Sequence, residues 1–161
     1  TVCTARNPRC LLCPIASACT ARRSGDPAWF PVKAAKKAKA VRQGRAFWIE
    51  REGVGDVPEV WLVRRQGTGM LGGMRALPDD GWAARADGSG EGPLSGPWES
   101  AGKVSHVFTH FALELNLSVY LGARYEALVD GEWWPLDRLD EAGLPTLFAQ
   151  AARLALAKEA A

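Results

Sequence analysis

The sequence predicts an α+β fold, in which a mixed β-sheet is combined with a few helices. From Leu113 to Leu121 apolar residues alternate with polar ones, which is the period of a strand with one buried face. Near the end of the chain, Leu147, Phe148 and Ala151 recur at helical spacing. The 161 residues are 47% hydrophobic and include 17 Gly and 10 Pro, a composition that favours a globular chain with many turns and short strands.

The chain divides into three parts, namely a Cys-containing loop over residues 1–20, a basic connector over 21–45 and a β-rich domain over 46–161. In the loop, Pro8 and Pro14 prevent a plain helix. The connector contains Asp26-Pro27 and Phe30-Pro31, which break any helix. Residues 1–45 carry ten of the 20 Lys and Arg residues but one of the 18 Asp and Glu residues. This asymmetry indicates a segment that meets a polyanion, the alternative being a solvated linker.

Residues 46–161 provide the elements of the expected sheet. Runs rich in aromatic and β-branched residues at 46–50 and 59–64, separated by glycines and a proline, predict a hairpin. Further strands are expected at 103–108 and 113–121, followed by an amphipathic helix over 145–155 that closes onto the sheet. Of the seven Trp residues, Trp48 and Trp61 are interpreted as core residues.

All four cysteines lie near the start of the chain, at Cys3, Cys10, Cys13 and Cys19. Two disulfides would suit a small secreted domain, but no secretion signal is present. Zinc sites usually use two separated Cys-x2-Cys pairs, whereas only Cys10 and Cys13 form such a pair here. The third interpretation is a four-thiolate iron–sulfur cluster, whose ligands a short irregular loop can supply.

The Cys-x6-Cys-x2-Cys-x5-Cys spacing resembles the cluster loop of the endonuclease III superfamily of DNA glycosylases. Together with the following residues, it is similar to the C-terminal part of the MutY family of adenine DNA glycosylases. The resemblance implies that Cys3, Cys10, Cys13 and Cys19 ligate a [4Fe–4S] cluster in the parent enzyme, which a fragment could lose or leave disordered. It also implies phosphate contacts from the basic residues of the connector, with Arg22, Arg23, Lys33, Lys36 and Lys37 as candidates.

The glycine-rich segment 67–78 resembles the part of the MutY C-terminal domain that is related to MutT and other Nudix hydrolases. The resemblance therefore implies a Nudix-like sheet. A Nudix box needs a helix that presents several carboxylates to Mg²⁺. Counted from Gly73, the first acidic position falls on Asp79, but the next positions fall on Asp87 and Gly88, inside a glycine-rich stretch that cannot be a helix. We therefore expect the fold without the hydrolase chemistry.

The segment from Val107 to Phe111 joins two expected strands. By itself it is more typical of packing than of recognition. In the MutY family the corresponding loop carries Phe-Ser-His and its hydroxyl residue meets 8-oxoguanine, which implies that Phe108, Thr109 and His110 bind the lesion. Thr109 keeps the hydroxyl and adds a methyl group. His106 is interpreted as structural.

The resemblance implies a function in base-excision repair on A:8-oxoguanine mispairs in double-stranded DNA. The catalytic carboxylates belong to a helix-hairpin-helix domain that the 161 residues do not include, so this chain alone is expected to be inactive as a glycosylase. Because it begins at Thr1, we expect a piece of a longer protein. No apolar run is long enough to span a membrane, and the family implies a cytoplasmic, nucleoid-associated location. A small Nudix-type nucleotide hydrolase and a zinc-binding interaction module remain as alternatives.

Overall fold

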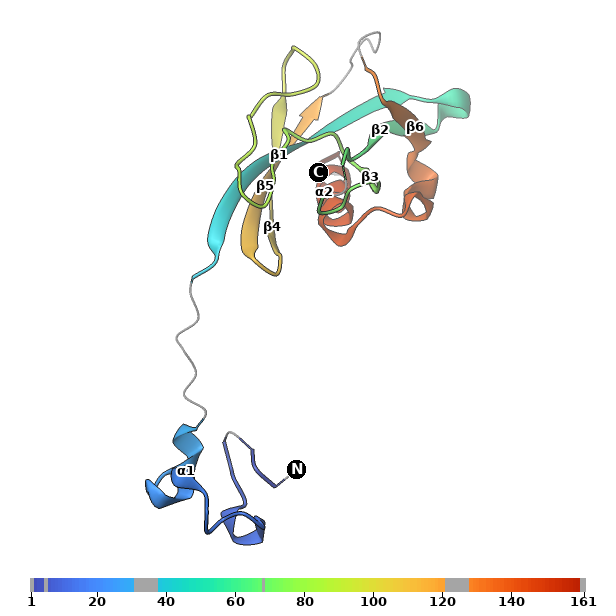
Figure 1. Ribbon diagram of the computed structural model, residues 1–161. Coiled ribbons are helices and arrows are strands. Elements are labelled where there is room, and N and C mark those ends of the chain that lie inside the picture. Colours follow the sequence, from blue (N-terminus) through green and yellow to red (C-terminus); the bar gives the residue numbers. More distant parts are fainter. Residues whose placement is uncertain (1, 5, 31–37, 68, 121–127, 160–161) are drawn as a thin grey trace. The chain divides into compact units, whose positions relative to one another are not determined.

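The computed structural model describes residues 2–4, 6–30, 38–67, 69–120 and 128–159. The chain forms two compact units, Thr1–Ala38 and Lys39–Ala161 (Figure 1). Among the described residues, no helix combines the length and the apolar character that crossing a membrane requires.

The first unit is built from short turns. It contains 3₁₀ turns at Cys10–Leu12 and Pro27–Trp29 and the single-turn helix α1, Thr20–Arg23. Asp26 caps the second 3₁₀ turn by accepting a hydrogen bond from the Ala28 amide at 3.1 Å. None of the described residues before 31 is buried, and the Leu11 side chain is 91% exposed. The described part of this unit therefore has no apolar core.

The described residues of the second unit form six strands and the helix α2. The strands are β1 Ala40–Glu52, β2 Pro58–Arg64, β3 Arg75–Ala76, β4 Glu99–Val107, β5 Phe111–Tyr120 and β6 Gly131–Pro135, and α2 spans Thr146–Glu159. Shorter 3₁₀ segments lie at Val54–Asp56 and Leu136–Ala142. The predicted α+β fold class, a mixed sheet with few helices, is confirmed.

The strands form one sheet in the order β3-β2-β1-β5-β4, with β6 paired to β2. The β1–β5 pair is parallel and all other pairs are antiparallel. The predicted hairpin is β1–β2, in which Glu50 pairs with Val60. The strand expected from Ala46 begins earlier, at Ala40, because parallel pairing with β5 starts there, opposite Phe111. The strand expected over 103–108 is β4, which ends at Val107.

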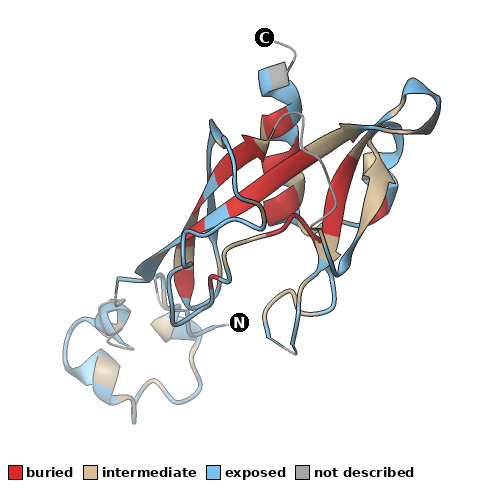
Figure 2. Cartoon of the chain, turned by 90° about the horizontal axis from the view of Figure 1, so that it is seen from above, coloured by how far each residue is buried: buried red, intermediate tan, exposed pale blue. Residues whose placement is uncertain are grey.

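The core lies between the sheet and α2. Trp48, Leu62 and Leu115 are completely buried on the sheet side, and Phe148 and Ala151 are completely buried on α2. Figure 2 shows the buried residues concentrated along the middle strands and the helix that crosses them. The expected amphipathic helix is thus confirmed, as is the interpretation of Trp48 and Trp61 as core residues.

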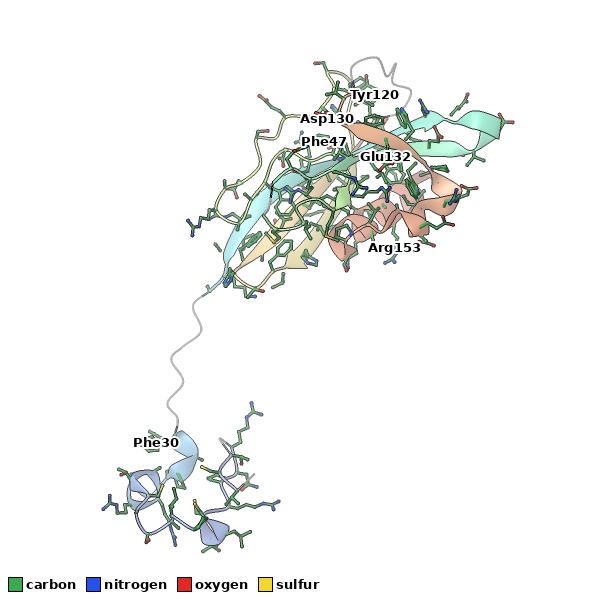
Figure 3. The ribbon with its side chains drawn as sticks, turned by 45° about the vertical axis from the view of Figure 1, so that its right-hand side comes forward. Phe30, Phe47, Tyr120, Asp130, Glu132 and Arg153 are labelled. Carbon is green, nitrogen blue, oxygen red and sulfur yellow. The ribbon has the colours of Figure 1, made fainter. Side chains whose placement is uncertain are left out.

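The middle of β1 is buried on both faces. Trp48 points to the core, while Phe47 on the opposite face is also 0% exposed. Phe47 contacts the Trp98 ring at 4.8 Å between centroids, and Trp98 contacts Tyr120 at 5.0 Å (Phe47 and Tyr120 are labelled in Figure 3). The segment before β4 therefore covers the second face of the sheet.

Candidate functional site

A tight hairpin between β4 and β5 carries the residues that sequence analysis selected for lesion binding. The turn is closed by the Phe108 amide, which donates to the Phe111 carbonyl at 2.9 Å. Thr109 and His110 are exposed at its tip, whereas Phe108 is half-buried. The structure thus presents a hydroxyl and an imidazole to solvent on a short turn between two paired strands.

Phe108 fixes this turn to the domain. Its ring stacks on Phe111 with centroids 4.8 Å apart, and it meets the His106 ring edge-on at 4.6 Å. A third contact, 5.9 Å between centroids, is made with Trp82, which is 1% exposed. Phe108 therefore packs inward, and the interpretation of His106 as a structural residue agrees with its contact to Phe108.

Trp82 is placed by a glycine on the neighbouring strand. A Cβ atom at Gly44 of β1 would lie 2.7 Å from Trp82 Cδ1, so only glycine leaves room for the indole. On its other side the guanidinium of Arg65 lies 4.2 Å from the ring centroid. Arg65, Trp82 and Phe108 thus form a continuous group of contacts that ends at the hairpin.

Arg65 and Trp82 also line a cavity of about 750 Å³. Its other walls come from the end of β2, from Met70, from the segment 78–85 and from Asp130. Arg65 Nε lies 3.0 Å from Asp79 Oδ2, and both side chains are largely buried. The Gly81 amide donates to the other carboxylate oxygen of Asp79 at 2.9 Å.

The segment that would hold a Nudix box has no helix anywhere between residues 77 and 98, all of which are described. Asp79, at the first acidic position, is paired with Arg65, and Asp87 accepts from the Gln43 amide at 3.0 Å. Within the described part of the chain, no three His, Cys, Asp and Glu side chains are grouped so as to hold a metal ion. Asp79 and Asp87 thus make structural contacts.

Burial raises the pKa of Asp79 above its ordinary value of 3.8, and the Arg65 guanidinium offsets this effect only in part. The folded protein holds the Asp79 proton more tightly than the unfolded chain does. The contribution of Asp79 to folding stability is therefore fully present below its ordinary pKa of 3.8. We expect that contribution to be lost as the pH rises through the raised pKa. The Asp79→Asn variant has no carboxyl group to titrate at this position. As the pH increases, the free energy of unfolding of the wild type should therefore fall relative to that of the variant. Urea denaturation from pH 4 to pH 7 measures it, and a difference that is constant with pH would contradict the assignment.

The basic residues predicted to contact phosphate all belong to the residue range of the first unit. Arg22 and Arg23 are exposed on α1 in the first unit. Lys33, Lys36 and Lys37 lie outside the described residues. Lys39 was not among the predicted residues, yet its Nζ donates to the Phe108 carbonyl at 2.7 Å. Trp82 and Arg65 were not predicted either, since no sequence signal indicates which distant aromatic ring lies behind a hairpin.

The four cysteines share one small cavity. Cys3, Cys10, Cys13 and Cys19 all line a space of about 70 Å³ in the first unit. All four are free thiols. Four thiols around one cavity suit an iron–sulfur cluster, which is larger than one ion and takes four Cys thiolates. The described side chains do not form the tighter grouping that a single ion needs.

Two models of known protein families match the chain. The model of the NUDIX domain matches residues 45–154, which is more than half of the chain. The model of the iron–sulfur binding domain of endonuclease III matches residues 3–19 and includes all four cysteines.

Solved structures with a similar fold include the C-terminal domain of mouse MUTYH in complex with human PCNA. That domain is 18% identical, with a TM-score of 0.56 over 74% of this chain and 90% of that one. The NUDIX domain of Shewanella oneidensis NrtR, complexed with ADP ribose, is 16% identical, with a TM-score of 0.53 over 83% and 96% of the two chains. The MutT protein of Methanosarcina mazei is 18% identical, with a TM-score of 0.51 over 76% and 99%. At these identities the similarity establishes the fold alone.

Proposed function

The chain belongs to the NUDIX domain family, and on that basis we propose that it is the C-terminal, 8-oxoguanine-recognising part of a MutY-like adenine DNA glycosylase. The observation that carries the proposal is the order of two motifs in one chain. An iron–sulfur motif of endonuclease III at residues 3–19 precedes a NUDIX domain at 45–154, and the fold of that domain is shared with the C-terminal domain of mouse MUTYH. In this proposal the substrate is double-stranded DNA with 8-oxoguanine opposite adenine.

The hairpin tip is the proposed lesion-reading element. Oxidation at C8 converts N7 of guanine from a hydrogen-bond acceptor into an N–H donor and adds a carbonyl oxygen. The exposed Thr109 hydroxyl can accept from the first group or donate to the second. Unmodified guanine has neither an N7–H nor a C8 carbonyl, and the hydroxyl can only donate to its N7. The proposed discrimination rests on this difference in hydrogen bonding at N7 and C8. His110 lies beside it at the tip, and Phe108 anchors the turn from inside.

The test is Thr109→Val, which keeps the side-chain shape and removes the hydroxyl. We expect the ratio of affinities for 8-oxoguanine:A and G:A duplexes to fall by about 5- to 150-fold, because leaving a buried polar group of the lesion without its hydrogen-bond partner costs about 1–3 kcal/mol. Fluorescence anisotropy at one fixed salt concentration measures both affinities. Thr109→Ser, which retains the hydroxyl, should keep the ratio. An unchanged ratio in Thr109→Val would show that this hydroxyl does not read the lesion.

In the same proposal Cys3, Cys10, Cys13 and Cys19 hold a [4Fe–4S] cluster. Their convergence on one cavity supports it, and so does the lack of an apolar core in the described part of the first unit. A bound cluster supplies the cross-links that such a segment needs. The chain's own contribution is to bring four thiols together by means of the turns that follow Arg9 and Cys13.

Non-specific affinity for DNA is assigned to the basic residues around the connector, including Arg22, Arg23, Lys33, Lys36 and Lys37. Neutralised phosphates release counterions, which gives such binding its affinity and its salt dependence. Removal of adenine is assigned to a helix-hairpin-helix domain outside the 161 residues.

A further inference from the structure

Lys39 joins the end of the basic connector to the lesion-reading hairpin. It directly precedes β1, and the first residue of that strand, Ala40, pairs with Phe111 at the base of the hairpin. From this position Lys39 Nζ donates a hydrogen bond of 2.7 Å to the Phe108 carbonyl oxygen. These two residues are far apart in sequence, so the contact depends on the parallel pairing of β1 with β5.

That hydrogen bond acts on the peptide group between Phe108 and Thr109. A peptide unit is planar and rigid, so its carbonyl and the next N–H point in opposite directions. When Lys39 holds the Phe108 carbonyl, the direction of the Thr109 amide is set, and the Thr109 side chain can then be reoriented only through its own φ and χ1 angles. The Phe108 amide on the other side is already used in closing the turn to Phe111.

The remaining contacts of the hairpin hold a different part of it. Phe111, His106 and Trp82 all touch the ring of Phe108. These ring contacts do not involve the peptide group between Phe108 and Thr109. The Phe108 carbonyl oxygen instead accepts the hydrogen bond that Lys39 donates, as seen among the described residues.

We propose that Lys39 is a positioning residue that orients the Phe108–Thr109 peptide, and thereby the Thr109 hydroxyl, for lesion discrimination. The inference rests on the proposed function of the hairpin. It gives Lys39 a role different from that of the neighbouring connector lysines. The Lys39 ammonium group is hydrogen-bonded within the protein and contributes to specificity for the lesion. The ammonium groups of the connector lysines are assigned to DNA phosphates and contribute to general affinity.

The test compares Lys39→Met with Lys158→Met. Lys158 is a matched control because its Nζ also donates to a backbone carbonyl, that of Ser100 at 3.2 Å, and pairs with Glu99 away from the hairpin tip. We expect Lys39→Met to lower the ratio of affinities for 8-oxoguanine:A and G:A duplexes by about 3- to 10-fold, and Lys158→Met to leave it unchanged. Lys39→Arg, which keeps a donor, should restore part of the ratio. Lys39→Met could instead lower the affinity for both duplexes equally and reduce the slope of log affinity against log salt concentration by the equivalent of about one phosphate contact. In that case Lys39 is a phosphate contact and the inference is wrong.

A second measurement needs no DNA. In ¹⁵N–¹H spectra of the free 161-residue protein, the Thr109 amide signal should shift in Lys39→Met and stay in place in Lys158→Met. An unshifted Thr109 signal overturns the inference whatever the hairpin binds. A shifted signal with an unchanged affinity ratio also overturns the specificity role, provided that Thr109→Val does lower the ratio. If neither Lys39→Met nor Thr109→Val changes the affinity ratio, the proposed function of the hairpin is wrong.

Discussion

Replacing Trp82 with alanine is expected to lower the free energy of unfolding by about 3–5 kcal/mol, the usual cost of deleting a large aromatic side chain from a core. The indole is 1% exposed, and it contacts both the Arg65 guanidinium and the Phe108 ring. Its N–H is buried and makes no hydrogen bond within the described structure, so the stabilisation comes from packing. Urea denaturation of the 161-residue protein, followed by circular dichroism, measures the loss.

Trp29→Ala provides the matched control for this prediction. Trp29 is 74% exposed in the first unit, and its removal should change stability by no more than about 0.5 kcal/mol. Trp82→Phe should be milder than Trp82→Ala, because it keeps a ring against Phe108 and removes the unpaired N–H. If Trp82→Ala and Trp29→Ala were equally tolerated, Trp82 would not be the support behind the hairpin.

Cys13→Ser is expected to abolish iron–sulfur binding in the protein purified without oxygen. A serine hydroxyl is a poor substitute for one of four thiolates around a shared cluster. Wild type should contain iron and acid-labile sulfide in equal amounts and absorb in the visible range, whereas the variant should lose both. Because the NUDIX domain is a separate compact unit with its own core, its thermal unfolding should be the same in both proteins.

Ser17→Ala, an exposed position between Cys13 and Cys19, is the control and should retain the cluster. Zinc in place of iron and sulfide in the wild type would instead identify a zinc-binding module. Retention of the full iron content by Cys13→Ser would remove this cysteine from the ligand set.

The secondary structure that could be predicted from the sequence is the part in which local pattern and tertiary environment agree. In β5 the alternation of Leu113, Leu115 and Leu117 with polar residues predicted one buried face, and all three are buried. The start of β1 at Ala40 was missed because Ala40, Val41 and Gln43 are exposed and show no alternation of apolar and polar residues, so that only pairing with β5 makes this segment a strand. β6 was missed because its short run is defined by its pairing with β2.

At the candidate site, the sequence predicted the hairpin but not what holds it in place. Phe108 was selected for its place beside the hydroxyl residue, yet its ring packs inward on Phe111 and Trp82. Trp82 lies in a segment without regular periodicity, and its position depends on the space left at Gly44. Contacts of this kind join residues far apart in the chain, so no local pattern predicts them.

The parallel ladder of β1 with β5 also determines how the domain withstands mechanical load. The connector enters β1 directly, and the ladder runs from Ala40 opposite Phe111 to Ile49 opposite Tyr120. Tension applied through the connector along the strand axis shears this ladder, so its evenly spaced hydrogen bonds share the force instead of breaking one by one. A pull on the basic segment is thus transmitted into the centre of the sheet, past the base of the hairpin.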